Sequence, residues 1–305
     1  MGFRVAVQWL HSCAGCEMAM LDMGPRLLTL LEEIELVHMP LLVDHKYHDP
    51  EGAEQPHIPA ADLGIVTGAV ANSEQLALLR VMRRQCRFLL GVGTCASHGG
   101  IPAMINAWPM AEALAATYQG IDSGSPPAPD QVPQPLDRVR ALDEEVEIDL
   151  LLPGCPPGPG QLEQVLTGLV AGKRPATAAR SVCDTCPTRR LSMADRKQVR
   201  RFVDNEGLAA DQPVAAMRCL LEQGLLCMGP VTAGGCDHNG APACIGARVP
   251  CRGCFGPVEP RGNQMLAMMN ILASHGLDFR SVVDRRAMLR FAGAHGLLRP
   301  ITRKR

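Results

Sequence analysis

The chain has 305 residues, with 30 basic and 31 acidic side chains and a formal net charge of −1. This balance provides no basic field for nucleic acid, and two Trp, two Tyr and six Phe are too few for a base-stacking platform. No run approaches the roughly eighteen apolar residues needed to cross a bilayer, and the start lacks a signal-peptide pattern, so we expect a cytoplasmic protein without a membrane span.

Strand and helix patterns alternate over the first 175 residues. Short runs rich in Val, Ile and Leu predict buried strands, which cover 3–10, 34–43, 62–70, 87–96 and 147–155. Helical spacing predicts helices, which cover 17–34, 72–86, 108–120 and 160–173, with a kink at Pro25 and a cap at Asn72 or Ser73. Buried strands separated by helices indicate a parallel sheet covered on both faces. We therefore predict an α/β class, with a flavodoxin-like, doubly wound domain over residues 1–175.

Two stretches depart from this alternation. Residues 120–145 are rich in Pro and charge, and we expect them to form a surface insertion. After residue 175 the pattern stops, because 176–260 have few long apolar runs and contain eight cysteines. We expect bound metal, rather than a hydrophobic core, to hold a loop-rich second domain over 176–305. One further helix is predicted there over 262–276.

Thirteen cysteines are an odd number, and a reducing cytoplasm disfavours disulfides, so metal binding is the usual alternative. Cys13 and Cys16 follow the first predicted strand, Cys95 ends the fourth, and Cys155 ends the fifth. Since open α/β sheets bind ligands at the carboxyl ends of their strands, we expect these four to converge. Gly or Pro beside each lets the backbone approach a bulky ligand. Cys86 has neither beside it and is predicted to be a buried structural thiol.

The eight later cysteines divide by proximity into two groups, Cys183, Cys186, Cys219 and Cys227, and Cys236, Cys244, Cys251 and Cys254. Zinc knuckles and iron–sulfur clusters both remain open for them. Three all-cysteine groups in a chain with little other catalytic signature favour an electron relay. No G-x-G-x-x-G follows the first strand, and no phosphate loop is present, so we expect no dinucleotide or flavin on this chain.

Six motifs occur in one order: CAGCE, GTCASHGG, LPGCPP, CDTCP, CLLEQGLLCMGP and PCRGCFGP. They resemble the small subunit of [NiFe]-hydrogenases from residue 3 to about 275, and most of all the cytoplasmic methyl-viologen-reducing type that does not reduce the deazaflavin coenzyme. The resemblance implies three [4Fe-4S] clusters. Their ligands would be Cys13, Cys16, Cys95 and Cys155 (proximal), Cys236, Cys244, Cys251 and Cys254 (medial), and Cys183, Cys186, Cys219 and Cys227 (distal).

Two ligand positions depart from the membrane-bound uptake relatives. Those relatives carry His where this chain has Cys183, and Pro where it has Cys244, so we expect a four-iron medial cluster of lower potential here. The resemblance places the nickel–iron centre in a partner large subunit. It implies electron transfer from dihydrogen through the clusters to an iron–sulfur or flavin subunit, with a heterodisulfide-reductase-like protein as one candidate.

Three other functions stay open. The chain could belong to an NAD(P)-linked or sulfur-reducing cytoplasmic hydrogenase, whose small subunit also has three clusters. It could be a complex I-like quinone oxidoreductase subunit, although that family has adjacent cysteines in its first motif and usually lacks the C-terminal cluster segment. It could also be a zinc-stabilised interaction module. Iron and acid-labile sulfide analysis would separate the last from the others.

Several other polar side chains have two interpretations each. Glu17 is either a carboxylate at a helix N-terminus or a group that helps protons leave the interface. His11 and His98 flank the first group of cysteines and either bond cluster sulfur or pack against it. The remaining candidate histidines lie in a polar loop, where we expect them to be solvated, with a fourth metal site as the alternative: His45, His48 and His57.

Overall fold

The computed structural model describes residues 2–43, 56–118, 130–175, 180–202, 212–238 and 240–300. These form two compact units, one of residues 1–176 with 291–305 and one of residues 177–290. The described residues at the C-terminus therefore pack with the first unit, whereas the sequence pattern assigns all of 176–305 to the second domain.

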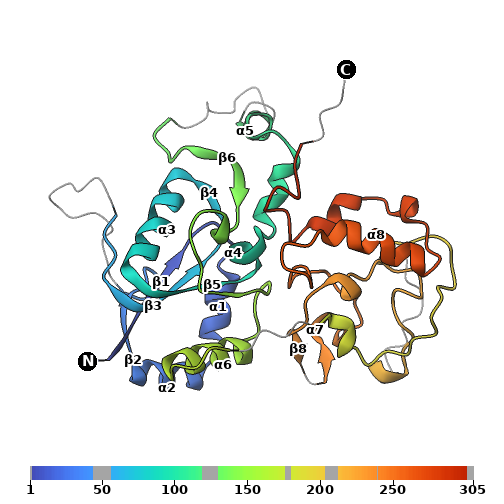
Figure 1. Ribbon diagram of the computed structural model, residues 1–305, viewed down its shortest axis with the longest axis horizontal. Coiled ribbons are helices and arrows are strands. Elements are labelled where there is room, and N and C mark those ends of the chain that lie inside the picture. The colour runs from blue at the N-terminus through green and yellow to red at the C-terminus, as the bar shows by residue number, and fades with distance from the viewer. Residues whose placement is uncertain are drawn as a thin grey trace. The chain divides into compact units, whose positions relative to one another are not determined.

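A five-stranded parallel sheet in the order β2-β1-β3-β5-β7 forms the centre of the first unit (Figure 1). Its strands are β1 (Phe3–Trp9), β2 (Ile34–His38), β3 (Ala61–Thr67), β5 (Cys86–Val92) and β7 (Leu150–Leu152). Counted within the sheet, this is the flavodoxin-like order 2-1-3-4-5. The predicted α/β class is confirmed, and β2 and β7 are shorter than their predicted strands.

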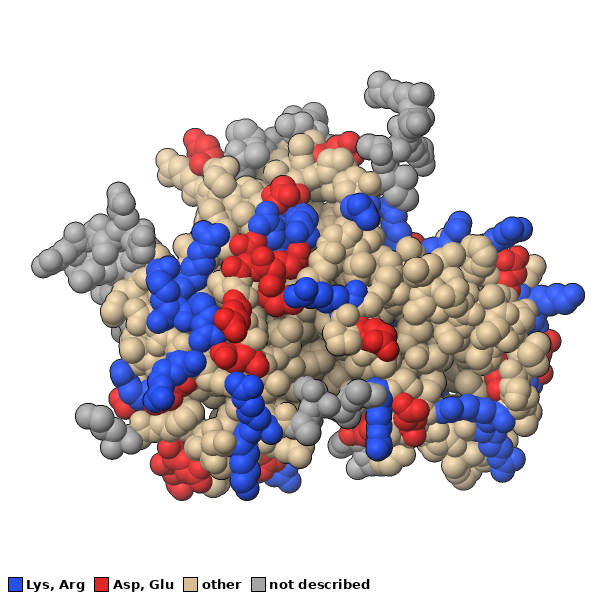
Figure 2. Space-filling view, in the orientation of Figure 1, with Lys and Arg blue, Asp and Glu red and all other residues tan. Residues whose placement is uncertain are grey.

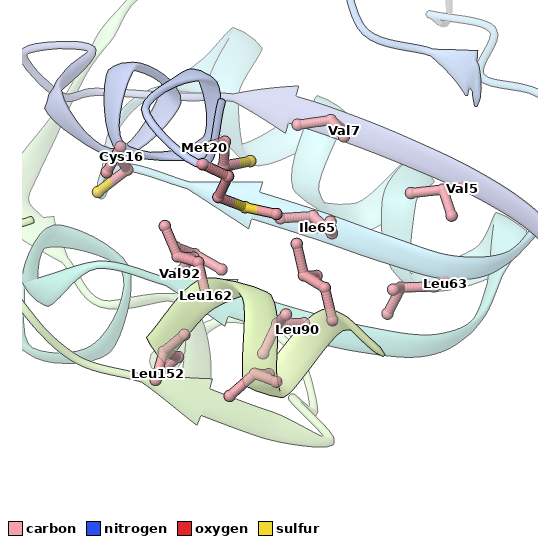
Figure 3. Close-up of a cluster of buried hydrophobic side chains, with 14 of the residues drawn as sticks. Val5, Val7, Cys16, Met20, Leu63, Ile65, Leu90, Val92, Leu152 and Leu162 are labelled. Atoms are coloured by element: carbon pink, nitrogen blue, oxygen red, sulfur yellow. The ribbon is translucent and has the colours of Figure 1, made fainter. Parts of the chain in front are cut away.

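Helices cover both faces of the sheet. One face packs against α1 (Gly15–Leu21), α2 (Pro25–Glu33) and α6 (Pro159–Val170), and the apolar cluster between them includes Cys16 (Figure 3). The other face packs against α3 (Ser73–Gln85). Two shorter helices, α4 (Thr94–His98) and α5 (Met110–Tyr118), belong to the same unit.

The predicted kink in the first helix is a complete break. Residues 22–24 separate α1 from α2, Gly24 has φ +60°, and Pro25 is the first residue of α2. Pro lacks an N–H and suits a first helical turn, so the chain restarts a helix there. The predicted cap of the next helix is confirmed, because the Asn72 side chain accepts a hydrogen bond from the Gln75 amide at 2.9 Å.

The expectation of a surface insertion is wrong for the second half of 120–145. Residues 119–129 lie outside the described part, but β6 (Pro135–Arg140) pairs antiparallel with β4 (Val70–Asn72). Val139 and Leu142 are buried. Pro is compatible with the first residue of a strand, so the Pro-rich composition concealed a short strand that is fixed by a distant partner.

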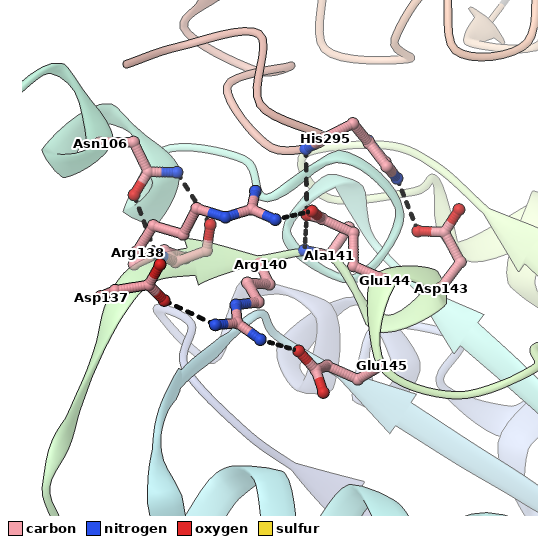
Figure 4. A network of polar contacts seen from close by, with 10 residues as sticks. Asn106, Asp137, Arg138, Arg140, Ala141, Asp143, Glu144, Glu145 and His295 are labelled. Carbon is pink, nitrogen blue, oxygen red and sulfur yellow. Dashed lines mark hydrogen bonds and ion pairs between the residues drawn. The ribbon is translucent and has the colours of Figure 1, made fainter. Parts of the chain in front are cut away.

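A polar network holds the C-terminal segment on the first unit (Figure 4). The His295 ring lies 2.8 Å from Asp143, and Glu144 accepts from the His295 amide at 3.0 Å and from the Ala141 amide at 3.1 Å. Arg138 pairs with Glu144 at 2.7 Å. The contacts of His295 span about 150 positions of sequence, which no local pattern encodes.

The second unit has little regular structure. Its elements are β8 (Asp237–His238), β9 (Ala241–Pro242), α7 (Ala243–Gly246) and α8 (Gln264–Ser274), with short 3-10 turns between them. The predicted last helix is confirmed by α8. The expectation that this part lacks an apolar core is wrong, because it buries a cluster that includes Leu220, Leu221, Leu225, Met268 and Leu272. Leu220, Leu221 and Leu225 come from a segment too short to show a period, and they pack with Met268 and Leu272 of α8.

The surface agrees with the balanced composition. Acidic and basic side chains are interspersed on the face shown in Figure 2. Across the described ranges, no helix is both long enough and apolar enough to cross a bilayer.

Asp149 fastens the last strand to the sheet, and its loss should weaken the fold. Its carboxylate accepts from Arg83 at 2.6 Å and from the Leu89 amide at 2.7 Å. Burial opposes ionisation, but these hydrogen bonds hold the pKa of Asp149 below its ordinary value. We expect Asp149→Asn to lower the free energy of unfolding at pH 7 by about 1–3 kcal/mol in denaturant titrations.

The pH dependence of this effect follows from the sign of the shift. The pKa of the Asp149 carboxyl is lower in the folded state than its unfolded value of about 3.9. The ionised carboxylate therefore stabilises the fold above that pH, and this stabilisation is lost as the pH falls through the folded pKa. The difference between wild type and Asp149→Asn should therefore be full above about pH 3.9 and shrink as the pH falls from there through the lowered folded value. Exposed Asp130 supplies the control: an equal loss in Asp130→Asn would contradict the assignment.

Candidate metal centres

Four cysteines of the first unit come together at the carboxyl edge of the sheet. Cys13 follows β1, Cys16 lies in α1, Cys95 lies in α4 after β5, and Cys155 follows β7. Burial raises the pKa of the Cys16 thiol well above its ordinary value, and the charges of Glu17 and of the three other thiols raise it further. The convergence expected from the sequence is therefore present in the fold.

Backbone hydrogen bonds join the two turns that carry the last two of these cysteines. The Gly93 amide donates to Leu152 O at 2.8 Å, and the Thr94 amide donates to Gly154 O at 2.9 Å. In return, the Gly154 amide donates to the Thr94 hydroxyl at 3.0 Å. The ends of β5 and β7 are thus held in one register, which fixes the spacing of the thiols that they carry.

Two glycines make room for sulfur at this edge. A Cβ added at Gly93 would lie 2.4 Å from Cys16 Sγ, and one added at Gly100 would lie 2.6 Å from Cys95 Sγ. Both glycines also have positive φ, at +91° and +52°, which side-chain-bearing residues rarely adopt. The backbone at these two points therefore accepts a close sulfur that no other residue would allow.

This group of thiols is suited to ligation rather than to nucleophilic catalysis. Burial, with the charges of Cys155 and Cys13, raises the pKa of Cys95 to about 12. Reactive cysteines have lowered pKa values, whereas thiols that repel one another as thiolates are stabilised by a bound cationic centre. Cys16 is buried, but Cys13 and Cys155 are exposed, so the group reaches the surface of the unit.

Glu17 lies in the first turn of α1, yet it is buried rather than solvated. Only 2% of the residue is exposed, and it accepts a hydrogen bond from the buried Thr67 hydroxyl at the end of β3. Its Oε2 has no hydrogen-bond partner among the described residues. Nothing in the local sequence pattern signals this burial, and a role in proton exit stays a prediction.

The two histidines beside this group differ in their surroundings. Burial lowers the pKa of His11, which follows β1. The His98 carbonyl accepts a hydrogen bond from the Ala294 amide at 3.2 Å, and the His98 ring stands edge-on to the His295 ring with centroids 6.5 Å apart. His98 therefore packs against the C-terminal segment. A hydrogen bond from either ring to cluster sulfur stays a prediction.

Cys86 and the loop histidines complete the sequence candidates of the first unit. Cys86 is 4% exposed, its pKa is raised to about 11 by burial, and a Cβ at Gly64 would lie 2.6 Å from its Sγ. The prediction of a buried thiol is confirmed. His45 and His48 lie outside the described residues, and His57 is exposed.

In the second unit, four cysteines line one pocket with an empty volume of about 340 Å³. A Cβ at Gly229 would lie 3.1 Å from Cys183 Sγ and 3.6 Å from Cys227 Sγ, so this glycine also gives sulfur room. Burial raises the pKa values of both thiols to about 12. The pocket brings together the predicted distal group, Cys183, Cys186, Cys219 and Cys227.

The other four cysteines lie within α7 or near it in the sequence. Cys236 precedes β8 and Cys244 lies in α7, while Cys251 and Cys254 follow it. Burial raises the pKa of Cys251, and the charges of Cys227, Cys244 and Cys254 add to the increase. Cys251 therefore lies close to Cys244 and Cys254 of the predicted medial group and also to Cys227 of the predicted distal group.

The two groups of the second unit meet at one hydrogen bond. The Cys251 amide donates to Cys227 Sγ at 3.3 Å, and the Met228 amide donates to Cys251 O at 3.0 Å. Amide donors to ligand sulfur raise the reduction potential of a cluster.

Across the described ranges, no three His, Cys, Asp or Glu side chains form a group that could hold a single metal ion.

One residue that the sequence interpretation missed organises the distal group. Glu222 is 1% exposed and accepts hydrogen bonds from the amides of Leu191 and Ser192, each at 2.7 Å at its shortest. Arg218 donates to its other oxygen at 3.2 Å. The signal was available, because Glu222 is the one acid in the leucine-rich segment between Cys219 and Cys227.

Comparison with known proteins identifies the family. A sequence-family profile described as "NADH ubiquinone oxidoreductase, 20 Kd subunit" matches residues 13–169. Over 300 residues, the chain is 34% identical to the iron-sulfur subunit of the F420-non-reducing hydrogenase of Archaeoglobus profundus, covering 90% of this chain and 88% of the relative. The chain belongs to the hydrogenase small-subunit family.

Other relatives of this small subunit agree. A subunit of the F420-non-reducing hydrogenase vhu of Methanocaldococcus jannaschii is 30% identical over 289 residues, which covers 94% of this chain and 93% of the relative. A chain in the structure of an NAD+-reducing [NiFe]-hydrogenase in the H2-reduced state is 32% identical, with a TM-score of 0.52, and covers 58% of this chain and 96% of that chain. The resemblance drawn from the six motifs is confirmed.

Gly93→Ala should disturb the first group of cysteines. The added Cβ would meet Cys16 Sγ, and the +91° φ is unfavourable for Ala, so the thiol must move. We expect the iron content per chain to fall below that of the wild type in protein purified without oxygen, because a displaced thiol no longer suits ligation.

Gly158→Ala is the matched control, because nothing lies within 4 Å of a Cβ there and its φ is −68°. It should keep full iron content. Full iron in Gly93→Ala would mean that the first group tolerates displacement of Cys16.

Proposed function

We propose that this chain is the electron-transfer small subunit of a [NiFe]-hydrogenase and holds three [4Fe-4S] clusters. The observation that carries the proposal is the meeting of Cys13, Cys16, Cys95 and Cys155 at the carboxyl edge of the sheet, with glycines at the points of closest sulfur approach. The hydrogenase relatives that match over both units support it.

Each group of thiols has a separate part in this proposal. When bound, iron–sulfur clusters supply one-electron transfer at potentials between about −700 and +450 mV. The proposed ligands are Cys13, Cys16, Cys95 and Cys155 for the proximal cluster, Cys236, Cys244, Cys251 and Cys254 for the medial cluster, and Cys183, Cys186, Cys219 and Cys227 for the distal cluster. The amide that joins the last two groups would stabilise added negative charge on the distal sulfur.

The proposed main partner is a large subunit that contains the nickel–iron centre. Apolar side chains are exposed beside the proximal thiols: Trp9 precedes Cys13, and Met18 follows Cys16. Ile101 is also exposed, and its amide contacts the Cys95 thiol. Exposed apolar residues around a functional edge are typical of a surface that another protein covers. Electrons would leave through a downstream iron–sulfur or flavin subunit, in a cytoplasmic complex.

A second candidate is the small subunit of an NAD(P)-linked or sulfur-reducing hydrogenase. The likeness to the NAD+-reducing enzyme favours it, although that likeness covers 58% of this chain. Purification of the native complex separates the two candidates. A flavin- and NAD(P)-binding partner would support the second, and a small iron–sulfur adaptor with a heterodisulfide-reductase-like protein would support the first.

Metal analysis tests the proposal directly. Three clusters require about twelve iron and twelve acid-labile sulfide per chain. Zinc without sulfide would overturn the proposal and leave the zinc-stabilised interaction module.

Cys244→Pro tests the medial assignment. Removal of one thiolate should convert the medial cluster to a three-iron form and raise its reduction potential, because fewer negative ligands surround the iron. Redox titration followed by electron paramagnetic resonance should show a new three-iron signal and the loss of about one iron per chain.

Cys86→Ala is the control, since Cys86 is buried in the core of the first unit at the start of β5, whereas Cys95 follows the end of that strand. Its spectrum should match the wild type. An unchanged medial signal in Cys244→Pro would show that Cys244 is not a ligand.

A further inference from the structure

A second pocket in the 177–290 unit lies beside Cys251 and is separate from the one that the distal thiols line. Three segments line it, residues 199–202, 250–252 and 281–284, together with Ala287, Arg290, Leu226 and Met228. Its empty volume is about 1120 Å³, including its open mouth. Cys251 is the one cysteine among the residues that line it, so the pocket adjoins the medial group without enclosing it.

The wall of this pocket is strongly positive. Four arginines line it, Arg200, Arg201, Arg252 and Arg290, against the single carboxylate of Asp284. That carboxylate is already engaged, because it accepts from the Arg286 amide at 3.0 Å at the start of a 3-10 turn. The pocket therefore has an excess of positive charge, although the chain as a whole is close to neutral.

Most of these arginines are available to a ligand. Arg200 donates its Nε to Gln223 O at 3.1 Å. Arg201, Arg252 and Arg290 form no ion pair with another residue in the part of the chain that the structure describes. Like charges gathered around one hollow repel one another, and a bound anion removes that repulsion. Guanidinium groups also offer paired donors that match phosphate and carboxylate oxygens.

Apolar side chains also line the pocket. Val282 and Met228 are buried, and Phe202 and Val283 are exposed at 37% and 86%. A ligand that fits both features has a multiply charged anionic group and a less polar remainder. Four arginines provide more donors than a single carboxylate can accept, which favours phosphate groups.

We propose that this pocket binds a small phosphate-bearing ligand beside the medial group of cysteines. The binding site stands on the geometry of the pocket alone. Its consequence rests on the proposed function: a bound polyanion next to Cys251 would lower the reduction potential of a medial cluster, since added negative charge disfavours reduction. Ligand binding would then set how readily electrons pass through the middle of the relay.

Calorimetric titration of the intact complex with pyrophosphate, ADP, citrate and adenosine tests the binding. Pyrophosphate and ADP should bind saturably, and adenosine, which has no phosphate, should not. In the double variant Arg252→Gln/Arg290→Gln, affinity should fall by at least about tenfold, because two charged hydrogen-bonding groups are removed. Arg285→Gln is the matched control, because Arg285 is an exposed residue of the same turn that does not line the pocket, and it should bind as the wild type does.

Three results would overturn the proposal. They are absence of pyrophosphate binding, equal affinity in the double variant, and binding of citrate more tightly than pyrophosphate. The potential of the medial signal, measured with and without pyrophosphate, tests the consequence separately. If metal analysis finds no clusters, the proposed function fails while the calorimetric result still decides the binding site.

Discussion

The close approach of sulfur to backbone is the constraint on which the first unit depends. Four thiols meet at the edge where β1, β5 and β7 end, and Gly93 leaves no space for a side chain against Cys16. The backbone hydrogen bonds between the ends of β5 and β7 keep that space open. Cys16 also belongs to the apolar cluster under the sheet, so the packing that stabilises the fold positions a thiol of the edge as well (Figure 3).

The second unit positions its thiols in a different way. Its regular elements are few and short among the residues that the structure describes. Its apolar cluster includes Cys227 and Cys251 together with Leu220 and Leu225, so two thiols of different groups are fixed by the same core. Glu222 then ties the loop after Cys186 to the segment that carries Cys219 and Cys227, through amide hydrogen bonds. A loop-rich segment can thus have well-defined thiol positions without long helices or strands.

Local pattern in the sequence predicted the five sheet strands, the Asn72 cap and the edge position of Cys95. It did not predict β6, because that strand forms through its pairing with the distant β4 and has no clear period of its own. Nor did it reveal that Glu17 is buried against Thr67, or that His295 attaches the C-terminal segment (Figure 4). A single acid or histidine looks the same in solvent and in a network, and only the fold that brings the partners together distinguishes the two cases.

The profile and the hydrogenase relatives match different lengths of this chain. The profile named for an NADH ubiquinone oxidoreductase subunit matches 13–169, which lies within the first unit, whereas the hydrogenase relatives match along about nine-tenths of the chain. The first unit is therefore the part of this chain that matches both the profile and the hydrogenase relatives. Under the proposed function, the second unit lengthens the path by two further groups of thiols. Residues 177–290 would then contribute both those two groups and the arginine-lined pocket that adjoins Cys251.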